Sequence, residues 1–285
     1  MEKIAVLIDS TSFLSEELKK ELDIRTVYLN IVINNHSYKE IIDMTADKYY
    51  EYLRDTNNSF PTTSQPAIGE VVACLEKLKE EGYTDVIAIA LSSGISGAYS
   101  SYTVAGLMVD GINVHPFDSE VSCKPEGWYA IKAANLIKEG KNSNEIISAL
   151  NEMKKVSKAY FMADDLSHLQ RGGRLSGAQA LVGSLLQVKP LLHFEDKIIV
   201  PFQKIRTYKK VVLRMYELFD EFYQEHKGEN IHVCVLHVDA IEKAHEIKEY
   251  LKDKYPDITI EIDVISPVIS THLGLGAIGF GWTIL

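Results

Sequence analysis

The chain has 285 residues, of which 46% are hydrophobic and 25% charged, a composition that excludes intrinsic disorder and indicates an ordinary folded protein. The formal net charge of −10 argues against a nucleic-acid partner and predicts at most transient membrane contact, because both surfaces attract basic proteins. The three cysteines, Cys74, Cys123 and Cys234, are far apart, which excludes a disulfide framework and is typical of a reducing cytosol. The first residues lack a basic segment followed by a long apolar run, so we expect no signal peptide and a cytoplasmic location.

Short apolar segments rich in valine and isoleucine alternate with amphipathic segments through the first half of the chain. The spacing of the apolar residues predicts strands over residues 3–8, 25–33, 85–91 and 113–118. It predicts helices over residues 15–22, 46–54, 66–81, 97–109 and 126–139, with a turn at Asn34-Asn35. Strands that alternate with helices favour a mainly parallel, doubly wound sheet covered by helices.

A helix predicted over residues 142–157 leads into a second domain. There we predict strands over residues 159–162, 190–194, 197–202, 231–238 and 259–265. We predict helices over residues 166–171, 177–187, 208–226 and 240–255, with a hairpin turn at Glu195-Asp196. Residues 264–285 are apolar but interrupted by polar residues and glycines, so we do not expect them to span a membrane. The pattern predicts an α/β protein with domains at residues 1–157 and 158–285.

Two segments carry hydroxyl groups next to predicted helices. Pro66 suits the first turn of a helix, which would place the hydroxyls of Thr63 and Ser64 beside free backbone N–H groups, a favourable position for an anion. A plain helix cap is the alternative. Ser93 and Ser96 follow the most hydrophobic strand, and ligands of doubly wound sheets bind at the carboxyl ends of strands. This second segment is neither a phosphate-binding loop of the GxxxxGK[ST] type nor a dinucleotide motif.

Two further segments combine glycines with a cation or an imidazole. Arg171 and Arg174 flank a glycine pair and provide planar donors for a phosphate or carboxylate, although a tight turn with solvated arginines is equally consistent. His272 precedes several glycines in an apolar stretch. A buried imidazole without a ligand is the usual reading of such a histidine, but the glycines favour close backbone packing or a ligand.

Catalytic patterns are weak in this sequence. It contains no GxSxG nucleophile motif and no HExxH motif. Asp164, Asp165 and His168 have no recognisable ligand spacing, so we predict no metal site. Ser93 or Ser96 with His272 would suggest serine hydrolysis, but no orienting acid is identifiable, and a binding role is favoured.

Taken together, these segments resemble the DegV family, the fatty-acid-binding proteins that serve as acyl-carrying subunits of bacterial fatty acid kinase. The resemblance spans nearly the whole chain. Its motifs are, in order, Asp9-Ser10-Thr11, Thr63-Ser64-Gln65-Pro66, Ser92-Ser93-Gly94-Ile95-Ser96-Gly97, Asp118-Ser119, Arg171-Gly172-Gly173-Arg174, Lys189-Pro190, Lys204-Ile205-Arg206-Thr207, and His272 with the following glycines. One departure is Leu275, where the family often has proline between the glycines.

The resemblance implies two α/β domains with a lipid site at or near their interface. It implies no cofactor, a long-chain fatty acid of about 14 to 18 carbons as ligand, and a separate kinase catalytic subunit as partner. The chain itself would be non-catalytic and would present the carboxylate for phosphorylation to an acyl phosphate. The residues that the resemblance assigns to the carboxylate are Thr63, Ser64, Ser93, Ser96 and His272, and it leaves open which serine makes direct contact.

The resemblance also implies roles for two arginines: Arg174 is the candidate for the acyl phosphate, and Arg206 is the candidate for docking the kinase. Two alternatives stay open at this point. The chain could be a stand-alone lipid transport or sensing protein, or a solitary acyl hydrolase that uses serine and histidine.

Overall fold

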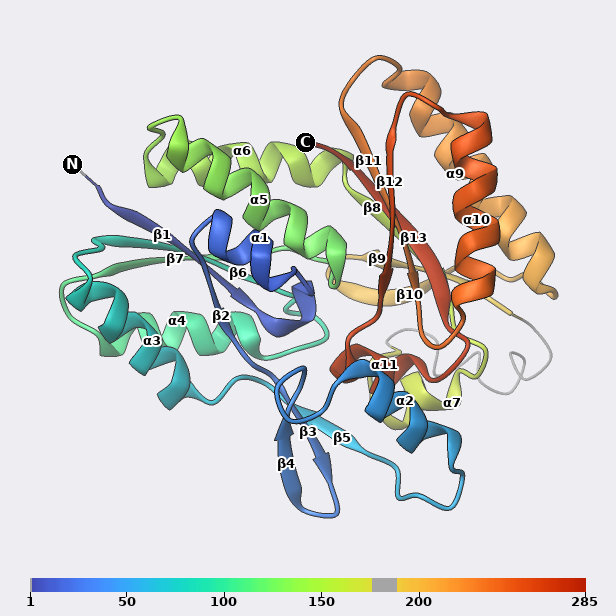
Figure 1. The fold of residues 1–285 in the computed structure, drawn as a ribbon, viewed down its shortest axis with the longest axis horizontal. Coiled ribbons are helices and arrows are strands. Elements are labelled where there is room, and N and C mark those ends of the chain that lie inside the picture. The colour runs from blue at the N-terminus through green and yellow to red at the C-terminus, as the bar shows by residue number, and fades with distance from the viewer. Residues whose placement is uncertain (1, 176–188) are drawn as a thin grey trace.

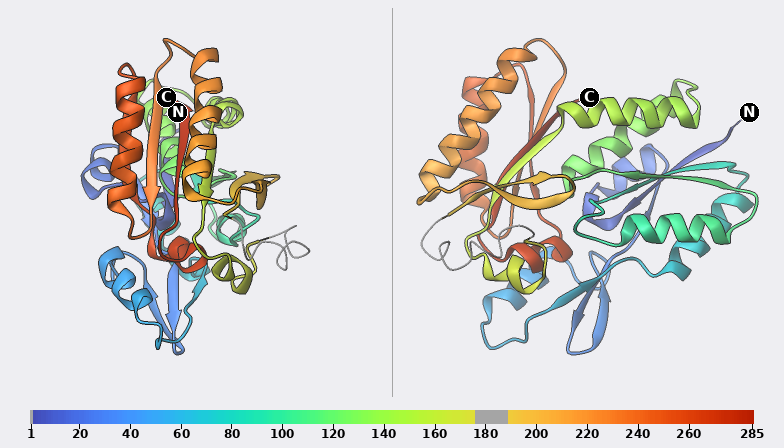
Figure 2. Two further views of the ribbon diagram at one scale, coloured as in Figure 1. Left: turned by 90° about the vertical axis from the view of Figure 1, so that its right-hand side faces the viewer. Right: turned by 180° about the vertical axis from the view of Figure 1, so that it is seen from behind.

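The computed structural model describes residues 2–175 and 189–285 of the chain. The helix that we predicted over residues 177–187 lies outside these described residues. Figure 1 shows two large sheets side by side, one in each half of the chain. A small third sheet and α2 (Ala46–Arg54) form one end of the molecule, beneath the junction of the two large sheets (Figure 2).

The N-terminal sheet is entirely parallel and has the strand order β2-β1-β6-β7. Its strands are β1 (Ile4–Asp9), β2 (Ile24–Val27), β6 (Asp85–Ala90) and β7 (Asn113–Asp118). The helices of this half are α1 (Glu16–Glu21), α3 (Ile68–Glu80), α4 (Ala98–Met108), α5 (Lys124–Lys138) and α6 (Ser143–Val156). Helices α3 and α4 cover one face and α5 and α6 the other (Figure 1). The predicted mainly parallel, doubly wound arrangement is confirmed.

One predicted strand of this half is wrong. Residues 25–33 do not form a single strand, because the chain leaves the parallel sheet after β2 and enters a separate antiparallel sheet as β3 (Asn30–Ile33). There β3 lies between β4 (His36–Lys39) and β5 (Thr62–Ser64). Only Asn30 separates the apolar residues 27–29 from the apolar residues 31–33, so the pattern does not reveal the change of sheet. The predicted turn at Asn34-Asn35 is confirmed, with φ of 49° and 65°, values that asparagine tolerates well.

The C-terminal sheet contains six strands among the described residues, in the order β10-β9-β8-β13-β11-β12. They are β8 (Lys158–Met162), β9 (Leu191–Glu195), β10 (Ile198–Gln203), β11 (Ile231–His237), β12 (Thr259–Val264) and β13 (Ile278–Ile284). The described helices are α7 (Ser167–Arg171), α9 (Tyr208–Glu225), α10 (Ile241–Lys254) and α11 (Pro267–Leu273). Figure 1 shows α9 and α10 on the face turned away from the N-terminal sheet.

The predicted hairpin is confirmed as the antiparallel pair β9–β10, with its turn at Asp196-Lys197, one residue later than predicted. The predicted β-α-β order is confirmed as parallel β11 and β12 joined by α10. The apolar residues 264–285, for which we predicted no membrane span, form α11 and β13 instead. Strand β13 pairs antiparallel with both β8 and β11 in the middle of the sheet. This central position explains why the segment is apolar, since both faces of β13 are buried.

Candidate ligand-binding cavity

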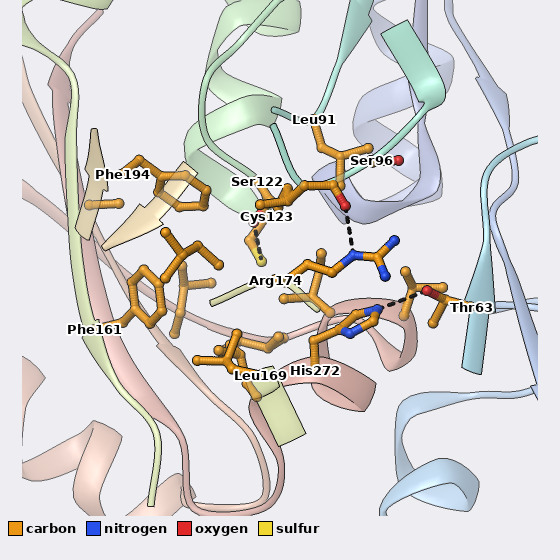
Figure 3. Close-up of a pocket in the computed structure, with 18 of the residues that line it drawn as sticks. Thr63, Leu91, Ser96, Ser122, Cys123, Phe161, Leu169, Arg174, Phe194 and His272 are labelled. Carbon is orange, nitrogen blue, oxygen red and sulfur yellow. Dashed lines mark hydrogen bonds between the residues drawn. The ribbon is translucent and has the colours of Figure 1, made fainter. Parts of the chain in front are cut away.

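A cavity of about 360 Å³ lies between the two large sheets, within the size range of small-molecule sites. Most of its wall is aliphatic or aromatic, from Leu29, Leu91, Ile95, Tyr160, Phe161, Leu169, Phe194, Ile199, Leu236, Ile265, Val268, Ile269, Leu273 and Phe280. Its polar lining residues include Thr63, Ser64, Gln65, Ser96, Arg174 and His272. Figure 3 shows Thr63, Arg174 and His272 toward one end and Phe161 and Phe194 toward the other. The cavity therefore has one polar end and an apolar body.

Thr63 and His272 meet at the polar end. Thr63 is the middle residue of β5, opposite Ile31 of β3, and its Oγ1 lies 2.8 Å from Nε2 of His272 in the last turn of α11. The predicted local setting of Thr63 and Ser64 is wrong: they form a strand, and α3 begins only at Ile68. Pairing with β3 extends the chain here, so their hydroxyls do not cap the following helix.

The imidazole of His272 is neutral at neutral pH, because burial, aided by the positive charge of Arg174, lowers its pKa to about 4. Its Nδ1 is buried and has no hydrogen-bond partner among the described residues. Gly172 lies directly against this atom, and a Cβ at that position would collide with Nδ1. The glycine pair of the arginine segment thus makes room for the imidazole.

Arg174 is fixed over the same end by two carbonyl groups. Its Nε donates to the carbonyl of Ile95 at 3.0 Å and its Nη1 to that of Gly172 at 2.5 Å. It lines the cavity and is partly buried, whereas Arg171 is exposed and lies over the ring of Phe60. Of the two arginines in this segment, the structure thus brings Arg174 into the cavity wall.

The serine loop after β6 contributes unequally to the cavity. Ser96 lines it, and its Oγ accepts a hydrogen bond from Ala98 N at 3.2 Å. Ser93 is not among the lining residues: its Oγ donates to Oδ2 of Asp118 at 2.5 Å, and its N–H donates to Oδ1 of the same residue. Burial opposes ionisation of Asp118, but hydrogen bonds from Ser93 and Lys197 hold the pKa of this carboxyl below its usual value. Asp118 thus anchors the loop as a carboxylate.

The end of β1 fixes two further parts of the wall. Asp9 accepts a hydrogen bond from Leu91 N at 2.8 Å and so holds the start of the serine loop. The Ser10 hydroxyl donates to Glu40, which in turn accepts from Val268 N at the start of α11 at 3.0 Å. All three side chains are buried. The Asp9-Ser10-Thr11 motif therefore acts as internal support for the cavity rather than as part of its lining.

Residues that the sequence analysis did not select also line the cavity, notably Gln65, Ser122 and Cys123. Gln65 belongs to the same motif as Thr63, so that motif could have indicated that Gln65 lines the cavity. Cys123 caps α5 with a φ of 62°, and burial raises the pKa of its thiol, which keeps it protonated. Nothing in the sequence near Cys123 indicated a place in the wall.

Arg206 lies apart from this site. It is exposed between β10 and α9 and lines a surface pocket with Lys204, Lys210 and Arg214. The structure therefore brings together Thr63, Ser64, Ser96, Arg174 and His272 but not Arg206, and it places Ser93 behind the wall.

Three observations bear on the other chemistries that the sequence raised, each made for residues 2–175 and 189–285. No hydrogen bond joins His272 to Ser93 or Ser96, because its Nε2 faces Thr63. No group of three or more histidine, cysteine, aspartate or glutamate side chains could hold a metal ion. No helix has the length and apolarity that crossing a membrane requires.

Known proteins resemble this chain along its whole length. A family model described as "Uncharacterised protein, DegV family" matches residues 3–284. Protein DegV of Bacillus subtilis is 51% identical over 280 residues, with 98% of each chain covered. A crystal structure titled as DegV, a fatty acid binding protein from Bacillus subtilis, has a TM-score of 0.94 at 49% identity and full coverage of both chains. A fatty acid binding DegV family protein from Streptococcus agalactiae has a TM-score of 0.91 at 30% identity, again over both whole chains.

Proposed function

The chain belongs to the DegV family, and from that membership we propose that it binds a long-chain fatty acid in the cavity between its two large sheets. The observation that carries the proposal is the division of the cavity into one polar end and an apolar body, which matches a carboxylate followed by a hydrocarbon chain. The similar structures from Bacillus subtilis and Streptococcus agalactiae, both titled as fatty acid binding, support it.

In this proposal the carboxylate lies against Thr63, His272 and Arg174. A neutral imidazole protonated at Nε2 donates to Thr63 Oγ1, across the 2.8 Å that separates these atoms. That bond leaves the single hydroxyl proton of Thr63 for a carboxylate oxygen. The guanidinium of Arg174 supplies the positive charge that a buried carboxylate requires. Ser64 and Ser96 line the same cavity, and Ser93 acts indirectly by holding the loop through Asp118.

The hydrocarbon chain supplies most of the driving force. About 14 methylenes that leave water gain ~11 kcal/mol gross, at ~0.8 kcal/mol each. Loss of motion on binding offsets much of this gain. In the proposed complex these methylenes pack against the aliphatic and aromatic wall of the cavity.

We further propose that a separate kinase phosphorylates the bound acid in the cytoplasm. A carboxylate oxygen would attack the γ-phosphorus of ATP held by the kinase, ADP would leave, and the acyl phosphate would stay on this chain near Arg174. The chain itself would catalyse no step. The support for this finer role is the family resemblance and the exposed cationic group around Arg206.

Mass spectrometry of the purified protein tests the binding role. We expect one fatty acid per chain in the native spectrum, released on denaturation and identified after extraction. A protein that arrives empty and takes up no added fatty acid would contradict the proposal. Steady release of product from an acyl ester by the isolated chain would instead favour the alternative of a solitary acyl hydrolase that uses serine and histidine.

The docking role of Arg206 has its own test. Arg206→Ala should leave the bound fatty acid unchanged and reduce kinase-dependent acyl phosphate formation at least about fivefold, because an interfacial charge contact is lost. Lys20→Ala, which removes an exposed cation on α1, is the matched control. Equal phosphorylation of both variants and the wild type would remove the docking claim and favour a stand-alone transport or sensing protein.

A further inference from the structure

A second cavity adjoins the first one. It has a volume of about 330 Å³, and its lining includes the exposed residues Lys158, Glu195 and Asp196, so it opens to solvent. Ala159, Tyr160 and Phe194 line both cavities. The two spaces therefore share a wall made by the adjacent strands β8 and β9.

Of the three shared residues, Phe194 is the one whose ring lies at the tail end of the first cavity (Figure 3). Ala159 has no side chain beyond Cβ, and the ring of Tyr160 is held in a stack between His193 and Trp282, at centroid distances of 5.7 and 5.4 Å. The ring of Phe194 packs instead against Phe161, 5.8 Å away, which lines only the first cavity.

Phe194 lies at the edge of the β8–β9 pairing, although it pairs with Ile199 of β10 on its other side. The β8–β9 ladder consists of the pairs Phe161–Leu192 and Tyr160–His193, and Phe194 is the next residue beyond its end. Its side chain is only partly buried. Figure 3 places Phe194 and Phe161 at the end of the cavity away from Thr63 and His272. A chain that starts at the polar end therefore meets Phe194 with its methyl end.

We propose that Phe194 sets the upper limit on acyl chain length by separating the tail end of the acyl cavity from the second cavity. The inference rests on the proposed fatty acid binding. A longer chain must push the ring against its packed neighbours, which is costly in a filled wall. Without the ring, the same chain gains room to extend past Ala159 toward Val121 and Tyr129 in the second cavity, although charged residues such as Lys158 and Glu195 also line that cavity.

Competition among saturated acids of about 14 to 22 carbons tests the role of Phe194. The whole protein is stripped of lipid, offered an equimolar mixture, and the bound acids are extracted and quantified. Phe194→Ala should raise the ratio of bound acids of about 20 carbons to those of about 16 carbons by on the order of tenfold. Phe194→Trp should shift the profile toward shorter acids, and this variant decides the question where the alanine variant does not fold.

Phe202→Ala is the matched control, because Phe202 lies on the partner strand of the same hairpin, is 38% exposed, and touches the shared wall only through edge contacts with Tyr160 and His193 without lining either cavity. Its acyl profile should equal that of the wild type. Phe194 variants that bind fatty acid with the wild-type profile would overturn the inference and leave the proposed function standing. A wild-type protein that binds no acid of any length would overturn both.

Discussion

The imidazole of His272 is fixed from two sides by residues far from it in sequence. Thr63 bonds its Nε2, and Gly172 leaves just enough room for Nδ1. Both contacts therefore fix the orientation of the imidazole ring at the polar end of the cavity. Two substitutions test this residue. One reduces the space beside its ring, and the other removes its titratable group.

Gly172→Ala tests the space. Gly172 has a φ of −71°, which alanine adopts freely, so the added methyl group acts only by displacing the His272 ring. We expect normal folding and fatty acid affinity weakened at least about tenfold, as a lost head-group contact would cost. Gly69→Ala, with open space around the new Cβ, is the control. Equal fatty acid affinity in both variants would show that His272 does not position the carboxylate.

The charge of His272 predicts a dependence of stability on pH. Its pKa is about 4 in the folded protein and about 6.5 in the unfolded chain. As the pH falls through this window, the unfolded chain takes up a proton that the folded protein does not bind, so the contribution of His272 to the free energy of unfolding falls by about 3 kcal/mol. Urea unfolding of ligand-free protein should show the wild type losing this amount relative to His272→Gln. A constant difference between variant and wild type across the window would contradict the prediction.

At the scale of elements, α11 depends on contacts from the N-terminal half. Glu40 accepts from Val268 N at its first turn, and Tyr49 OH lies 2.5 Å from Oγ1 of Thr271 near its end. A buried carboxyl group at a helix start satisfies one of the backbone N–H groups that the helix leaves unpaired. The helix that carries the head-group histidine is therefore oriented by residues more than 200 positions earlier in the chain.

Glu40 predicts a pH dependence of the opposite sign. Burial raises its pKa to about 7, against an ordinary value near 4.5. As the pH rises through this window, the unfolded chain releases a proton that the folded protein keeps, so the contribution of Glu40 to the free energy of unfolding falls by about 3 kcal/mol. Glu40→Gln keeps the shape, and urea unfolding should show the wild type losing this amount relative to the variant. The exposed Glu51→Gln is the control, and identical pH profiles for the two variants would contradict the prediction.

At the scale of the whole molecule, the larger of two apolar clusters among the described residues runs through both halves, while the smaller one lies between the C-terminal sheet and helices α9 and α10. A single cluster of buried side chains extends from β1 to residues of β8, β9 and α11. Polar contacts also join the halves, since Arg54 bonds both carboxylate oxygens of Asp239, at 2.8 and 2.6 Å. The domain boundary near residue 157 stays a prediction, but these contacts favour unfolding of the two halves as one unit.

The two tryptophans test this coupling, because Trp128 lies in α5 and Trp282 in β13 and both are buried. Trp128→Phe leaves only the C-terminal probe, and Trp282→Phe only the N-terminal one. In each variant, urea unfolding followed by fluorescence should coincide with that followed by far-ultraviolet circular dichroism. Independent domains would instead give different urea midpoints for the two signals. The fluorescence midpoint would lie below the circular dichroism midpoint in one variant and above it in the other.

The sequence by itself determined the type and order of most elements, including a mainly parallel N-terminal sheet and the β9–β10 hairpin. It also indicated the segments that carry Thr63, Arg174 and His272. These features follow from local rules, because the period of apolar residues reports which side of an element is buried and glycine or asparagine pairs report turns.

Only the tertiary structure decided how those segments meet. It split residues 25–33 between two sheets, made Thr62–Ser64 a strand, and turned the Ser93 hydroxyl toward Asp118. It also joined Thr63 to His272, which lie 209 positions apart. Such pairings depend on which distant backbone edge or side chain is available in the folded protein, and no local pattern along one chain carries that information.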